Sequence, residues 1–141
     1  MNALRPPART SVPIHELLAH RFSTRGYDPD RPVAPETLTA LFEAARWAPS
    51  CFNDQPWRFI VWNREEDRAA WERAVACLTT GNQSWARHAP ILLLSLARTH
   101  FAGDRSPNRW GEHDTGLGTM GLLVEAQSRG LSGHPMGGFD R

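Results

Sequence analysis

The residues best suited to chemistry lie in one stretch, residues 48–57, which reads A-P-S-C-F-N-D-Q-P-W. Its two prolines fix backbone angles and remove N–H donors, while Ser50, Asn53 and Gln55 offer hydrogen-bonding groups without charge. A rigid loop with neutral polar groups suits a planar heteroaromatic ligand. The alternative is an ordinary helix-to-strand connection whose Ser and Asn side chains bond their own backbone. This stretch alone leaves both interpretations open.

A second polar cluster, Arg21-Phe22-Ser23-Thr24-Arg25, follows a short helical pattern. Guanidinium groups and hydroxyls match the geometry of phosphate oxygens, so the cluster is a compact candidate for an anion-binding site. The alternative is a solvated loop whose arginines pair with nearby acids such as Asp28 and Asp30. Taken in isolation, the cluster favours that alternative.

The helices that must position these residues are read from apolar periodicity and from boundary residues. We expect a first helix from about Ser11 or Pro13, and a second that opens at Pro35-Glu36 and ends before Pro49. A third helix is expected over residues 65–78, stopped by Gly81-Asn82. The last should run from Asp114-Thr115, which are cap candidates, to about residue 129, where Gly130 ends it.

Two strands are expected, at about residues 58–62 and 91–97. The second, I-L-L-L-S-L-A, is a continuous apolar run typical of a strand buried on both faces, so we expect it at the centre of the sheet. Residues 82–85 are interpreted as a polar patch with an aromatic residue. The irregular residues 98–111 are interpreted as a lid or a surface loop.

Composition limits the classes of protein to which the chain can belong. Its 141 residues suffice for one domain, and 40% hydrophobic with 22% charged residues is typical of a soluble globular protein. A net charge of +1 argues against a nucleic-acid coat or a polybasic membrane anchor. With two cysteines, no signal segment and no apolar run long enough for a bilayer, we expect reducing cytoplasm.

Two tempting motifs are rejected. Gly116, Gly118 and Gly121 match the G-x-G-x-x-G dinucleotide fingerprint, but that motif works only where a strand leads directly into the glycine turn. We interpret these glycines as one helix face that lets another helix approach closely. The six histidines are scattered, so no zinc site is expected, and no serine or cysteine stands in a nucleophile motif.

Taken in order, these motifs resemble those of the FMN-dependent nitroreductase family over residues 13–141. The resemblance rests on four segments: residues 21–25, the block A-P-S-C-F-N-D-Q-P-W-R-F at 48–59, Gly81-Asn82, and Asp114-Thr115-Gly116 with the later P-M-G-G-F-D at 135–140. Each motif is weak alone. Their common order and their spacing make the set specific.

The resemblance implies a fold, a reaction and partners. The fold would be α+β: a helix-rich, three-layer α/β/α arrangement with a small central sheet, spanning residues 13–141 after a flexible arm at 1–12. The protein would be a homodimer with FMN at the interface. It would transfer hydride from NAD(P)H through flavin N5 to a nitroaromatic, quinone or similar small-molecule acceptor, with no metal, nucleic acid or membrane involved.

The resemblance also implies roles for individual residues. Arg21, Ser23 and Arg25 would bind the phosphate, ribityl chain and pyrimidine edge of FMN, and Asn82 would hydrogen-bond the flavin ring. Pro135, Met136, Gly137 and Gly138 would lie along the isoalloxazine, with the Gly137 N–H approaching N5. Pro49, Ser50, Asn53 and Gln55 belong to the loop that the second chain would supply, and Asp114 would also reach across.

The sequence departs from the family pattern in two ways. Relatives continue beyond the G-F-D motif with further strands and basic residues, whereas this sequence stops at Arg141, either as a truncated product or as a shortened form. Phe22 stands where relatives often have a basic residue. Two alternatives are therefore kept: a flavin-binding module without turnover, and a non-catalytic fragment that dimerises through the helix face at 116–123.

Overall fold

The computed structural model describes residues 6–140, so residues 1–5 of the expected arm and residue 141 lie outside the described part. The elements are α1 (Glu16–His20), α2 (Pro35–Arg46), the 3₁₀ turn η1 (Cys51–Asn53), β1 (Trp57–Asn63), α3 (Arg68–Ala76), α4 (Thr80–Ala86), β2 (Ile91–Ala97) and α5 (Gly111–Ser128). β1 and β2 pair antiparallel, with Trp57 opposite Ala97 and Trp62 opposite Leu92.

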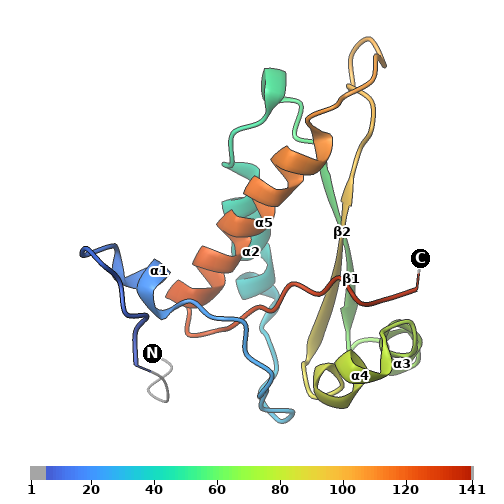
Figure 1. Ribbon diagram of the computed structural model, residues 1–141. Coiled ribbons are helices and arrows are strands. Elements are labelled where there is room, and N and C mark those ends of the chain that lie inside the picture. Colours follow the sequence, from blue (N-terminus) through green and yellow to red (C-terminus); the bar gives the residue numbers. More distant parts are fainter. Residues whose placement is uncertain (1–5, 141) are drawn as a thin grey trace.

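Helices cover both faces of this two-stranded sheet, which confirms the expected three-layer arrangement (Figure 1). On one face, α2 and α5 enclose a core of Leu41, Ala45, Leu122 and Ala126, against which Phe59 and Leu93 of the sheet pack. On the other face, α3 and α4 bring Trp71, Val75, Trp85 and Ala86 against Leu92, with Trp62 beside them. Alternate strand residues therefore serve two separate cores.

Glycines of α5 determine how closely its neighbours approach. A Cβ at Gly121 would lie 2.9 Å from the Ala44 carbonyl oxygen of α2, and one at Gly118 would lie 3.1 Å from the Trp57 ring. At Gly116 a Cβ would meet nothing within 4 Å. The close helix approach is thus confirmed at Gly121. All three glycines lie inside a helix, as the rejection of a dinucleotide site requires.

Two expectations about the middle of the chain are wrong. Gly81-Asn82 does not end a helix but lies in the first turn of α4, because burial of Trp85 and Ala86 offsets the low helix propensity of these residues. β2 is not buried on both faces: Leu96 is 42% exposed, because α3 and α4 cover only the end of the sheet near Leu92. With two strands among the described residues, the sheet has no central strand.

The last helix begins earlier than expected. α5 starts at Gly111, three residues before Asp114, and no side chain caps its N-terminus. Asp114 and Thr115 are therefore not caps; both are buried inside the first turns of the helix. The early start depends on Gly111, since a Cβ there would lie 2.4 Å from the Arg98 carbonyl oxygen.

Candidate functional site

The loop at 48–57 has an unusual backbone. Phe52, Asn53 and Gln55 have φ of 53°, 54° and 50°, in the left-handed region that residues other than glycine rarely adopt. Local bonds hold this shape: the Gln55 N–H donates to Ser50 Oγ at 3.0 Å, and Gln55 Nε2 donates to Asn53 Oδ1 at 3.1 Å. The polar side chains thus satisfy their own loop, as the alternative interpretation proposed.

Asp114 fixes the same loop from α5. Its side chain is 6% exposed, and Oδ2 accepts a hydrogen bond from the Cys51 N–H at 2.8 Å. Oδ1 lies 3.0 Å from Nδ1 of His113. The carboxylate is therefore used inside its own chain, where it orders the loop and does not face solvent.

Asp54 joins the loop to the segment that follows β2. Its side chain is 7% exposed and pairs with Arg98 at 2.7 Å, while Oδ1 accepts from the Ala102 N–H at 2.8 Å and Oδ2 from Asn108 Nδ2 at 3.3 Å. Burial alone would raise the pKa of this carboxyl. The hydrogen bonds and the Arg98 charge outweigh burial and hold the pKa below its ordinary value.

Within the expected loop at 98–111, residues 99–108 form an ordered hairpin. His100 and Pro107 make an antiparallel bridge, and the Phe101 N–H donates to the Ser106 carbonyl at 2.9 Å. The hairpin continues from the end of β2. The hydrogen bonds of Asp54 with Ala102 and Asn108 fix it to the loop at 48–57. This geometry is that of a fixed rim more than of a mobile lid.

The arginines at 21 and 25 are available for a ligand. Ser23 and Arg25 are exposed and Arg21 is half-buried at the end of α1. Within residues 6–140 neither arginine forms an ion pair, and the Asp28 carboxylate instead accepts the Asp30 N–H at 3.0 Å in a turn. The expected alternative, in which Asp28 and Asp30 neutralise these arginines, is therefore wrong.

Asn82 meets the glycine-rich C-terminal segment. Asn82 Nδ2 donates to the Gly138 carbonyl at 3.1 Å, and the Thr79 N–H donates to the same oxygen at 3.0 Å. A Cβ at Gly138 would lie 2.8 Å from Thr79 Oγ1, so glycine is needed for this approach. Gly137 is exposed with open space where a Cβ would stand, and Pro135 is exposed beside the partly buried Met136.

Three aromatic residues link these segments: Trp85, the aromatic residue of the patch at 82–85, and His134 and Tyr27, to which the sequence analysis gave no role. The rings of Trp85 and His134 stack with centroids 4.4 Å apart, and Trp85 also stacks on Tyr27 at 6.2 Å. His134 Nδ1 lies 2.7 Å from the Thr24 carbonyl oxygen, which can only accept, so Nδ1 carries the proton. Burial raises the pKa of Tyr27 to about 12, and its hydroxyl stays neutral.

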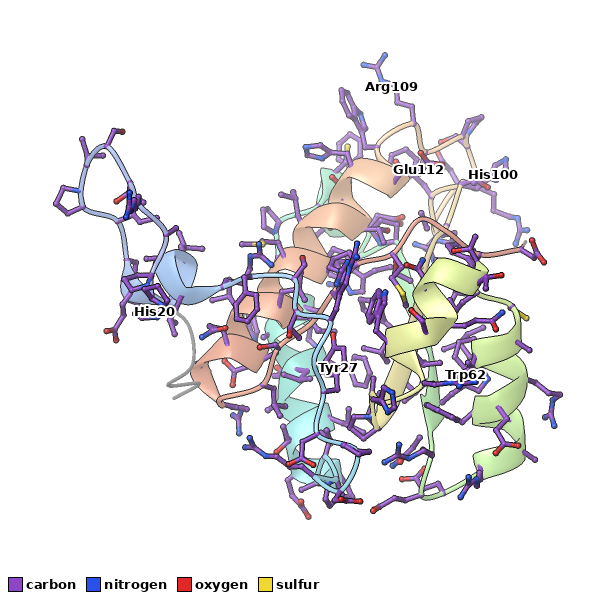
Figure 2. All side chains as sticks on the ribbon, turned by 60° about the horizontal axis from the view of Figure 1, so that its bottom comes forward. His20, Tyr27, Trp62, His100, Arg109 and Glu112 are labelled. Atoms are coloured by element: carbon purple, nitrogen blue, oxygen red, sulfur yellow. The ribbon has the colours of Figure 1, made fainter. Side chains whose placement is uncertain are left out.

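The candidate residues thus form two groups. The first, at 21–25, Asn82 and 134–138, is connected by the contacts just described, and the second is the loop at 48–57 with Asp114. Figure 1 shows α1 beside the C-terminal end of α5 and the loop at 48–57 near its N-terminal end. Figure 2 shows His20, which precedes the segment at 21–25, far from Arg109, which precedes α5.

Other kinds of site find little support in the described residues. No three His, Cys, Asp or Glu side chains among residues 6–140 cluster as metal ligands. No helix of this part of the chain is long and apolar enough to cross a membrane. Cys51 and Cys77 are both free thiols.

Comparisons with known proteins agree on one family. The family model described as "Nitroreductase family" matches residues 18–141. A "Putative NADH dehydrogenase/NAD(P)H nitroreductase" of Ralstonia nicotianae is 30% identical over 90% of this chain and 73% of its own. An oxygen-insensitive NAD(P)H nitroreductase of Salmonella typhimurium is 30% identical over 61% of this chain and 40% of its own.

Solved structures give the same picture. A crystal structure described as an oxidoreductase containing FMN superimposes with a TM-score of 0.86 at 33% sequence identity. It covers 94% of this chain, and this chain covers 67% of it.

Proposed function

Because the chain belongs to the nitroreductase family, we propose that it is an FMN-dependent oxidoreductase that uses NADH or NADPH. If bound, FMN would supply the redox chemistry, the transfer of a hydride from the nicotinamide through N5 to a nitroaromatic, quinone or similar acceptor. The chain's own residues would bind and orient the cofactor.

One observation carries this proposal: two arginines that form no ion pair within residues 6–140 lie on a segment that is hydrogen-bonded to the C-terminal glycine segment. Arg21 and Arg25 offer the charge that a phosphate ester needs, with the Ser23 hydroxyl between them. The Asn82 Nδ2 donor is used by Gly138, so Oδ1 remains to accept from the flavin N3–H, the donor on the oxidised ring. The open backbone at Gly137 supports a close approach of its N–H to the ring.

The visible absorption spectrum of the purified protein, before and after anaerobic NADPH or NADH, tests the function. A yellow protein that bleaches supports the oxidoreductase. A yellow protein that keeps its colour supports a flavin-binding module without turnover. A colourless protein that binds no added FMN would contradict both.

Arg21→Ala combined with Arg25→Ala should weaken FMN binding about tenfold or more, because charge-assisted hydrogen bonds to the phosphate are lost. Titration of apoprotein with FMN, followed by quenching of flavin fluorescence, measures the change. Arg73→Ala with Arg87→Ala is the matched control, since it removes the same charge from two exposed positions elsewhere. Equal affinities in both pairs would refute the phosphate assignment.

The proposed assembly is a homodimer whose second chain brings Pro49, Ser50, Asn53 and Gln55 to the flavin, with Asp114 holding their loop in shape. The positions of the two groups near different ends of α5 in the described part of the chain support this arrangement (Figure 1). Exposed apolar side chains near that loop also support it: Trp47 is 80% and Phe52 90% exposed, and Leu117 and Met120 are partly exposed one turn apart on α5.

Leu117→Glu with Met120→Glu should therefore convert the dimer to a monomer and reduce FMN binding in parallel, because like charges would face each other across the interface. Sedimentation velocity and flavin content measure the two effects. Leu96→Glu, on the comparably exposed Leu96 of β2, is the control. A double variant that stays dimeric would exclude this face of α5 from the interface.

A further inference from the structure

The first group of candidate residues comes from three segments that are distant in sequence: 21–25, α4 with Asn82, and 135–138. A cofactor with a phosphate at one end and a ring at the other needs these segments at a fixed separation. If one segment shifts, the chain can no longer contact both ends of the ligand at once. What holds the segments together therefore determines how well they bind one ligand at once.

Three connections hold these segments together, and two of them are contacts with α4. Gly138 is bonded to α4 through Asn82 and Thr79, and Tyr27 stacks on Trp85 of the same helix. Figure 2 shows Tyr27 on the side of its segment that faces α4. Asn82 and Trp85 are three residues apart, so they lie on one face of the helix.

The third connection links the segment at 21–25 directly to the segment at 135–138, and His134 makes it. Its Nδ1–H donates to the Thr24 carbonyl at 2.7 Å while its ring stacks on Trp85 at 4.4 Å. His134 precedes Pro135, and Thr24 lies between Ser23 and Arg25. The histidine thus contacts the segment at 21–25 between two candidate ligands, contacts α4 one turn from Asn82, and is bonded covalently to Pro135.

We propose that His134 is a positioning residue for the flavin site, which holds the segment at 21–25 and the segment at 135–138 at the separation that FMN requires. This inference rests on the proposed function. It assigns His134 no contact with the reacting atoms. Its hydrogen bond sets the distance between the segments, and its stack on Trp85 fixes the ring that makes the bond.

The test compares two ligands. FMN engages both segments, whereas lumiflavin, which has the ring and no ribityl phosphate, engages only the ring side. His134→Phe keeps the stack and removes the donor, so we expect FMN to bind about fivefold to tenfold more weakly and lumiflavin to bind within about twofold of wild type. His134→Asn places an amide donor near the position of Nδ1 and should recover most of the FMN affinity.

Fluorescence titration of the full chain gives both dissociation constants, and circular dichroism shows that each variant is folded. His100→Ala is the control, because this exposed histidine lies in the hairpin, away from Tyr27 (Figure 2). If both ligands weaken equally in His134→Phe, or if Asn gives no recovery, the positioning role is refuted and His134 is only structural.

The failures of the two proposals are distinguishable. A wild-type chain that binds neither FMN nor lumiflavin overturns the proposed function, and the role of His134 falls with it. A wild-type chain that binds FMN, together with a His134→Phe variant of unchanged FMN affinity, overturns the role of His134 alone.

Discussion

Replacing Gly121 by valine will lower the free energy of unfolding by roughly 3 kcal/mol. A Cβ at this position would lie 2.9 Å from a backbone oxygen of α2, and backbone cannot rotate away as a side chain can. The helices must separate to admit it, and the core of Leu41, Ala45, Leu122 and Ala126 between them would open. Urea unfolding followed by far-ultraviolet circular dichroism measures the loss.

Gly81→Val in α4 is the matched control. A Cβ at Gly81 would meet nothing within 4 Å, and valine has a somewhat higher helix propensity than glycine. The control should therefore change the free energy of unfolding by less than about 0.5 kcal/mol. Similar losses at Gly81 and Gly121 would mean that β-branching in a helix, and not the approach of α2 to α5, is responsible.

Asp54→Asn should lower the free energy of unfolding by about 2 kcal/mol at pH 7. The change removes the charge that pairs with Arg98 and places an amide where the oxygens accept three hydrogen bonds. The expected cost is moderate because the Arg98 side chain is 28% exposed and water can partly replace its partner. Chemical denaturation over a range of pH measures it.

The pH dependence follows from the lowered pKa of Asp54. A carboxyl with a lower pKa in the folded chain stabilises it fully above the unfolded pKa of about 4 and loses that contribution as pH falls through the folded pKa. The difference between wild type and Asp54→Asn should therefore shrink below about pH 4. Asp30→Asn is the control, since it removes the same charge from an exposed position elsewhere. If the difference in free energy of unfolding stayed constant down to pH 2, the ionised Asp54 carboxylate would be excluded as the cause of the stabilisation.

Elements whose pattern is carried by adjacent residues could be predicted from the sequence. α2 begins at Pro35 as expected, and β2 spans the expected residues 91–97. α4 could not be predicted, because the residues that form it, Gly81 and Asn82 among them, favour turns in isolation and only the burial of Trp85 in the core makes the helix stable. Local propensity carries no information about a core built by distant segments.

The same distinction applies to the candidate site. The sequence selected Asn82 and Gly138 separately, and the structure shows that they bond each other. It gave no signal for the pairing of Arg98 with the Asp54 region or of His134 with Thr24, which lie 44 and 110 residues apart. Single polar residues without a repeating pattern look alike in sequence, whether they end in solvent or in a tertiary contact.

The left-handed residues of the loop at 48–57 make this loop a store of conformational energy. Three residues other than glycine hold positive φ there, and each costs of order 1 kcal/mol relative to an ordinary conformation. The hydrogen bond from the Cys51 N–H to buried Asp114 holds the loop in this conformation. Exchange of that one amide hydrogen with deuterated solvent therefore reports how often the loop releases its energy by opening locally, without unfolding of the two cores.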